Sequence, residues 1–69
     1  MLRLKIKELR ESKGLSVRQL SEATGIRWNT LNDMEKNIAK HWPPEHLNKL
    51  MDFFDLKEIS QLIEYLAEP

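Results

Sequence analysis

Residues 17–36 place the strictest demands on how this chain can fold. Within this segment an apolar residue, Leu20, is followed directly by a small residue, Ser21, and four positions later by a glycine, Gly25. Leu20 can fill a close crossing of two helices, and Ser21 leaves room for the helix that passes over it. Gly25 accepts the positive φ that a tight turn needs. The spacing therefore predicts a helix-turn-helix over residues 17–36.

Three apolar residues and one capping pair complete this pattern. Ile26 is expected to pack between the two helices at the turn, and Leu31 and Met34 are expected to face the core from the second helix. Ser16 can cap the first helix through its hydroxyl, and Gln19 can reach back to the amide of Ser16. Each of these demands is weak evidence alone, but here they are met together at consistent spacing.

Helix signals also dominate the rest of the chain. Gly14 and Asn37 stand where left-handed residues commonly end helices, and the paired prolines that follow suit a first helical turn. Apolar residues at helical spacing predict further helices over residues 2–13, 43–54 and 57–67. We therefore expect an all-α fold, a compact bundle of about five short helices without strands, in one domain of residues 1–69.

Charge is balanced overall but divided unevenly along the chain. Residues 1–42 carry nine Lys or Arg and five Asp or Glu, whereas residues 43–69 carry two and six. We interpret this division as one surface that meets an anion and another that is kept away from it. The alternative is that the acids only solvate the C-terminal helices.

Several kinds of chemistry lack the residues they need. The chain has no cysteine, and His41 and His46 straddle two prolines in a way that suits no metal site. It has neither a phosphate-binding glycine loop nor a nucleophile arrangement. We expect no enzyme activity, no metal and no cofactor. Neither a signal peptide nor a membrane span is evident, so a cytoplasmic location is expected.

The motif residues resemble those of the Cro/C1-type (lambda-repressor-like, or XRE) helix-turn-helix regulators of phages and bacteria. The likeness covers nearly the whole chain, from Ile6-Lys7-Glu8-Leu9-Arg10 through Leu20-Ser21, Gly25-Ile26, Asn29-Thr30-Leu31 and Met34-Glu35. It implies a transcriptional regulator, a repressor of the Cro/C1 type, whose third helix lies in the major groove of DNA. It also implies an ion pair between Arg10 and Glu35. Val17 departs from the glutamine that often grips a phosphate in this family, and Asn37 departs from a glycine.

The exposed face expected for the third helix supplies the candidates for base reading. They are Trp28, Asn29, Asn32 and Asp33. Asparagine can bridge two atoms of adenine, and aspartate can accept from cytosine. Contacts to the DNA backbone are expected from Ser16, Arg18, Arg27, Thr30, Lys36 and Lys40. The competing interpretations are a solvated helix face for the polar residues and packing against Trp42 or a neighbouring helix for Trp28.

Double-stranded DNA is the expected partner, bound by two copies on a palindromic site. A homodimer through the expected C-terminal helix would use Ile59, Leu62, Ile63, Tyr65 and Leu66, unless these residues are buried in the monomer. The alternative function is a protein-interaction module on the same fold, such as an antitoxin or an anti-repressor. A third possibility is the DNA-binding domain of a longer regulator, although the absence of a linker at the end of the sequence favours a complete small protein.

Overall fold

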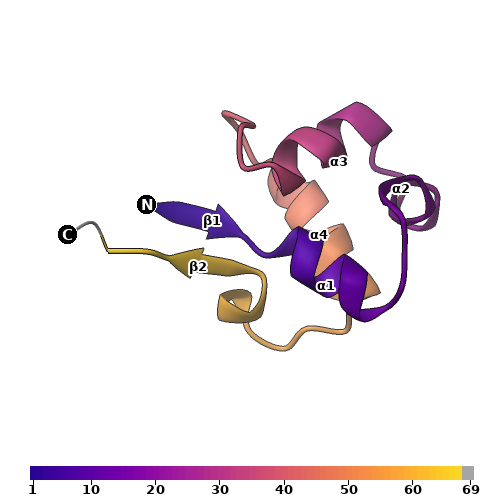
Figure 1. Cartoon of the computed structure of the whole chain (residues 1–69). Helices are drawn as coiled ribbons and strands as arrows, with labels where there is room; N and C mark the ends of the chain where they lie inside the picture. The colour runs from indigo at the N-terminus through magenta and orange to yellow at the C-terminus, as the bar shows by residue number, and fades with distance from the viewer. Residues whose placement is uncertain (68–69) are drawn as a thin grey trace.

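The computed structural model describes residues 1–67 and combines four α-helices with a small sheet (Figure 1). The elements are β1 (Leu2–Leu4), α1 (Ile6–Ser12), α2 (Val17–Thr24), α3 (Trp28–Glu35), α4 (Pro44–Phe53), the 3-10 turn η1 (Ile59–Gln61) and β2 (Ile63–Tyr65). The helices form a body from which β1 and β2 project side by side.

Local signals place the helix boundaries. Ser16 and Gln19 form the expected capping box, in which the Gln19 amide donates to Ser16 Oγ at 3.1 Å and the Ser16 amide donates to Gln19 Oε1 at 2.8 Å. Gly25 ends α2 at a φ of 78° and Asn37 follows α3 at a φ of 60°. Pro44 begins α4. These predictions are confirmed. The sequence could predict these boundaries because each depends on groups only a few residues apart.

A single apolar core joins the helices to the sheet. Its side chains are Leu4, Ile6, Leu20, Ile26, Leu31, Met34, Leu50, Phe54 and Leu62, none more than 6% exposed. The core therefore takes side chains from β1, from all four α-helices and from the segment just before β2. None of the helices in residues 1–67 has the length and apolar character to cross a membrane.

The two ends of the chain differ from the expected helices. Residues 2–4 and 63–65 form an antiparallel sheet, with Leu2 opposite Tyr65 and Leu4 opposite Ile63. The first residues alternate apolar and basic side chains, which is a strand period that the prediction of a helix over residues 2–13 overlooked. The strict all-α expectation is therefore wrong, although the described chain is mostly helical.

The predicted helix over residues 57–67 is also wrong. Gln61 Oε1 accepts from the amides of Lys57 at 2.7 Å and Glu58 at 2.9 Å, which closes a single 3-10 turn. The next residue, Leu62, is completely buried, and the chain then pairs with β1. Pairing with a distant strand outweighs the helical spacing of the apolar residues in this segment.

Candidate nucleic-acid interface

The turn between α2 and α3 is held by side-chain hydroxyls as well as by packing. Ser21 Oγ donates to the Ile26 carbonyl at 2.5 Å, and Thr24 Oγ1 donates to the Leu20 carbonyl at 2.8 Å. Leu20 and Ile26 are buried between the helices. The motif's spacing demands only a small side chain at position 21, so the hydroxyl of Ser21 is an additional constraint on the angle between α2 and α3.

Helix α3 is tied to α1 by an ion pair. Arg10 Nε donates to Glu35 Oε2 at 3.0 Å and Arg10 Nη2 donates to Glu35 Oε1 at 2.6 Å. The two side chains are only 15% and 9% exposed. The bond to Glu35 raises the pKa of Arg10, and a third bond runs from Arg10 Nη1 to the Leu15 carbonyl at 2.8 Å. This bidentate pair fixes both the position and the rotation of α3.

Packing divides α3 into an inner and an outer face. Leu31 and Met34 are completely buried, which leaves the opposite side of the helix without protein contacts to fill it. The exposed residues on and next to α3 are Arg27, Trp28, Asn29, Asp33 and Lys36. Asn32 and Thr30 are partly exposed. All the candidates for base reading therefore reach solvent.

Trp28 is the one large apolar side chain on this outer face. It is 49% exposed and does not belong to the core or to the side chains packed against it, whereas Trp42 does pack there. The aromatic pair within residues 1–67 is Phe53 with Phe54. The structure thus offers no support for packing of Trp28 on Trp42.

The cations around the motif are free of internal partners. Arg18, Arg27, Lys36 and Lys40 are exposed, and none forms an ion pair with another residue of the described chain. Ser16 is exposed, and its oxygen accepts from the Gln19 amide, which leaves the hydroxyl proton available. The outer face of α3 and the start of α2 therefore present donors and positive charge to solvent.

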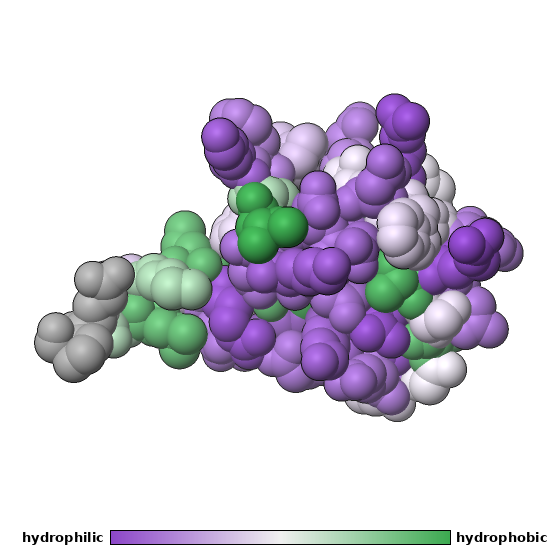
Figure 2. Space-filling model, turned by 45° about the horizontal axis from the view of Figure 1, so that its top comes forward, coloured by the Kyte–Doolittle hydropathy of each residue, from purple (hydrophilic) through white to green (hydrophobic). Residues whose placement is uncertain are grey.

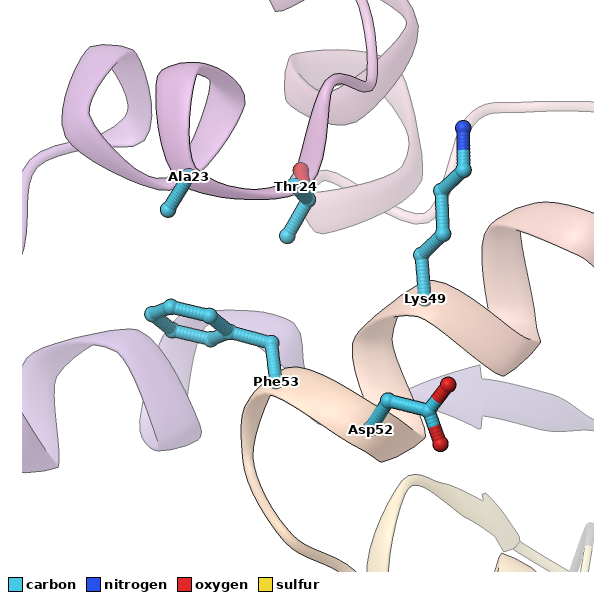
Figure 3. A pocket seen from close by; sticks show the side chains of 5 residues that line it. All are labelled: Ala23, Thr24, Lys49, Asp52 and Phe53. Atoms are coloured by element: carbon cyan, nitrogen blue, oxygen red, sulfur yellow. The ribbon is translucent and has the colours of Figure 1, made fainter.

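A shallow hollow of about 310 Å³ lies between α2 and α4 (Figure 3). Ala23 and Thr24 form one side, and Phe53 extends its ring beneath Ala23 from the other side. None of the candidates for DNA contact lines it. The hollow therefore adds nothing to the interface on α3.

The expected dimer surface has to be revised with the fold. Residues 57–67 form no helix to carry it, and Leu62 lies in the core with an exposed fraction of 0%. Ile63 is partly buried against the core. The remaining apolar residues are exposed, with Ile59 at 55%, Tyr65 at 71% and Leu66 at 44%.

The crossing of α2 and α3, the left-handed turn at Gly25 and the open polar face of α3 define a helix-turn-helix protein. The chain matches the family model of the Cro/C1-type HTH DNA-binding domain over residues 5–68, and it belongs to that family. Membership indicates a DNA-binding regulator, and the family is typically non-enzymatic. No curated protein matches the chain, and no solved structure does either.

Proposed function

We propose that this protein is a sequence-specific transcriptional regulator, a repressor of the Cro/C1 type, and that α3 enters the major groove of DNA. The observation that supports this most directly is the division of α3. Its inner face is anchored by buried side chains and by the Arg10–Glu35 pair, while its outer face is mostly polar and exposed to solvent. A helix held rigidly with one open face is what reading base edges requires.

Asn29 and Asn32 are assigned to base reading. An asparagine amide can make two hydrogen bonds to adenine at once: its NH₂ group donates to N7, and its oxygen accepts from the N6 amino group. Exposed Trp28 is assigned to contact with a thymine methyl group or the sugar edge, and exposed Asp33 to accepting from the amino group of cytosine.

Contacts to phosphate position the helix and carry no sequence information of their own. Arg18, Arg27, Lys36 and Lys40 have no internal acidic partner among the described residues, so binding DNA would break no ion pair of theirs. Ser16 and Thr30 complete the set of proposed backbone contacts. Because the chain has a formal net charge of zero, these local charges rather than a general basic character would attract DNA.

The test is selection of DNA sites from a random duplex pool, followed by binding measurements on the recovered sites. We expect Asn29→Ala and Asn32→Ala to lose preference at one base pair each, by about 1–3 kcal/mol for a bidentate contact. Asn48→Ala is the matched control, because Asn48 is an exposed asparagine on α4. Unchanged preference in both α3 variants would remove the assignment of these residues to base reading.

The second candidate is a protein-interaction module on the same fold, such as an antitoxin or an anti-repressor. It is favoured by the zero net charge and by the half-exposed ring of Trp28 on the outer face of α3. Salt separates the two functions. Binding to DNA through several phosphates weakens steeply as salt rises, whereas an apolar protein interface responds little.

A further inference from the structure

The end of α3 is held by one short side chain that bonds to a distant strand. Asn37, which follows α3 at a φ of 60°, accepts from the Leu4 amide through Oδ1 at 2.7 Å. Its Nδ2 group donates to the Leu4 carbonyl and to the Glu35 carbonyl, each at 3.3 Å. The side-chain amide therefore uses its acceptor and both of its donor hydrogens to join the last turn of α3 to β1.

A residue that only ended the helix would not need the bonds to Leu4. The positive φ at position 37 lets the amides of Asn37 and Ile38 donate back to the carbonyls of Met34 and Asp33, both at 3.1 Å. Glycine accepts the same conformation and closes a helix in the same way. The side chain of Asn37 therefore adds a contact between two parts of the molecule that the helix end itself does not require.

The strand that receives these bonds is a fixed point. Leu4 is 1% exposed in the core, and the amide of the next residue, Lys5, donates to the Leu62 carbonyl at 2.8 Å. In the antiparallel register, Leu4 stands opposite Ile63 in a pair whose amide and carbonyl groups point away from the partner strand. Asn37 takes both of these groups of Leu4. Strand β1 is thus held between β2 on one side and the end of α3 on the other.

The sheet itself is poorly suited to contact phosphate. Arg3 already pairs with Glu8 and Glu64, and Lys5 Nζ donates to the Ser60 carbonyl at 3.1 Å. In Figure 2 the hydrophobic surface gathers at the end of the molecule that carries the sheet, while the helical body is largely hydrophilic. An effect of the sheet on DNA binding must therefore act through α3.

The length of α3 decides how much freedom at its end would matter. At the start of the helix, the bond from Ser21 Oγ to the Ile26 carbonyl fixes the turn. A helix of eight residues is about 12 Å long, so a shift of about 2 Å at its far end tilts it by about 10°. The side chains of a binding site must be held within about 0.5 Å and 10–20° of their working geometry. Freedom of this size at the end of α3 is therefore enough to weaken base contacts.

The Arg10–Glu35 pair and Asn37 hold α3 in different ways. The ion pair joins α3 to α1 through two long side chains. The side chain of Asn37 is short, and it bonds to main-chain groups of the buried residue Leu4. A short side chain has fewer torsions and allows less movement. The ion pair thus sets the helix against α1, while Asn37 limits the movement of its end.

We propose that Asn37 is a positioning residue for DNA recognition, which fixes the end of α3 to β1 and so holds the outer face of the helix at one angle. This inference rests on the proposed function. The amide of Asn37 is already used within the molecule, so Asn37 acts through the residues assigned to base reading, Asn29 and Asn32. The sheet then contributes to sequence preference without contacting DNA.

The first experiment compares Asn37→Gly with the wild type in binding to a DNA site selected from the random pool and to a duplex of random sequence. Glycine accepts the same φ, and circular dichroism checks that the fold is retained. We expect affinity for the selected site to fall about tenfold, roughly the value of one bidentate base contact, and affinity for the random duplex to stay unchanged. A merely structural role would lower the folded fraction and change both affinities by the same factor.

Asp55→Gly is the matched control. Asp55 also follows a helix, α4, at a positive φ of 53°, but its exposed side chain bonds to Lys57. The ratio of the two affinities should keep its wild-type value in this variant. Asn37→Asp is a second test variant, because it keeps the size and the acceptor but sets an oxygen against the carbonyls of Leu4 and Glu35. It should lower the ratio in the same direction as Asn37→Gly.

The second experiment needs no DNA. Amide hydrogen exchange is followed at Ile38, which bonds to the Asp33 carbonyl at the end of α3, and at Gly25, which bonds to the Ser21 carbonyl at the end of α2. We expect Asn37→Gly to lower protection at Ile38 several-fold relative to Gly25, because local opening of the end of α3 becomes easier. A general loss of stability would lower protection at both amides together.

Two results would overturn the proposal: a wild-type affinity ratio in both Asn37 variants, and unchanged protection at Ile38 relative to Gly25. A wild type that reads sequence, together with Asn37 variants that read it equally well, contradicts the positioning role alone. A wild type that binds no duplex DNA contradicts the proposed function, and the role of Asn37 in recognition fails with it.

Discussion

The helix-turn-helix and the two-stranded sheet share one core but leave opposite kinds of group unpaired. In the motif, the helices satisfy their own backbone, and the cations Arg18 and Arg27 have no acidic partner in the described chain. In the sheet, Arg3 is paired with both Glu8 and Glu64, while the outer backbone groups of β2 remain open. The two regions therefore expose different groups: the motif presents unpaired cations, and the sheet presents an open backbone edge along β2.

The sharpest test of this comparison asks whether the sheet belongs to the core at all. Leu4→Ala should lower the free energy of unfolding by about 2–4 kcal/mol, because Leu4 is 1% exposed and its loss leaves a cavity. Leu2 lies on the same strand and face but is 57% exposed, so Leu2→Ala should change stability little. Urea unfolding of both variants measures the contrast. Equal effects would mean that β1 does not pack as described.

The next largest effect should come from the ion pair behind the motif. Glu35→Leu leaves the guanidinium of Arg10 mostly buried without its partner, which should cost about 2 kcal/mol. Combining Arg10→Met with Glu35→Leu removes both charges and should recover much of that loss. Thermal unfolding of the single and double variants tests this. Additive losses in the double variant would contradict a direct coupling between the two residues.

Asn37 connects the two regions, and substitutions there can separate its two roles. Asn37→Gly keeps the positive φ available but removes the hydrogen bonds to Leu4, and should cost about 1 kcal/mol. Asn37→Ala should cost somewhat more, about 1–2 kcal/mol, since alanine disfavours that conformation as well. Hydrogen exchange at the Leu4 amide should accelerate in both variants. Unchanged exchange would show that the side chain does not hold β1.

The smallest effect concerns the unpaired cations. Arg27→Gln should weaken binding to duplex DNA by about 1 kcal/mol and lower the slope of affinity against salt by about one. Lys57→Gln serves as the comparison, because Lys57 already pairs with Asp55 at 2.9 Å and lies far from the motif in sequence. Fluorescence anisotropy at several salt concentrations measures both. Equal losses would contradict the assignment of DNA contact to the motif.

The motif could be predicted from the sequence because its rules are local. The capping box at Ser16 and Gln19 spans three residues, and the turn at Gly25 depends on a single backbone angle. The buried positions Leu31 and Met34 follow from helical spacing alone. The candidates for DNA contact are exposed or partly exposed, and their roles stay predictions that the binding experiments above address.

The sheet could not be predicted in the same way because its partners lie at opposite ends of the chain. The spacing of Ile59, Leu62 and Ile63 fits a helix as well as it fits a turn followed by a strand. Only the presence of β1 beside this segment decides between them. The role of Asn37 was likewise hidden. Its helix-ending conformation was predicted, but its bonds to Leu4 join residues 33 positions apart.

The bond between Met1 and Leu66 spans 65 positions, and this separation has a consequence for the order of folding. Helices and their caps close over a few residues, whereas bringing the two strands together requires a loop of nearly the whole chain. We therefore expect the helical body to form first and the sheet to close late, so that substitutions at the β1–β2 pairing mainly accelerate unfolding and leave the folding rate unchanged. The outer edge of β2 then exists only in molecules whose helices are already assembled.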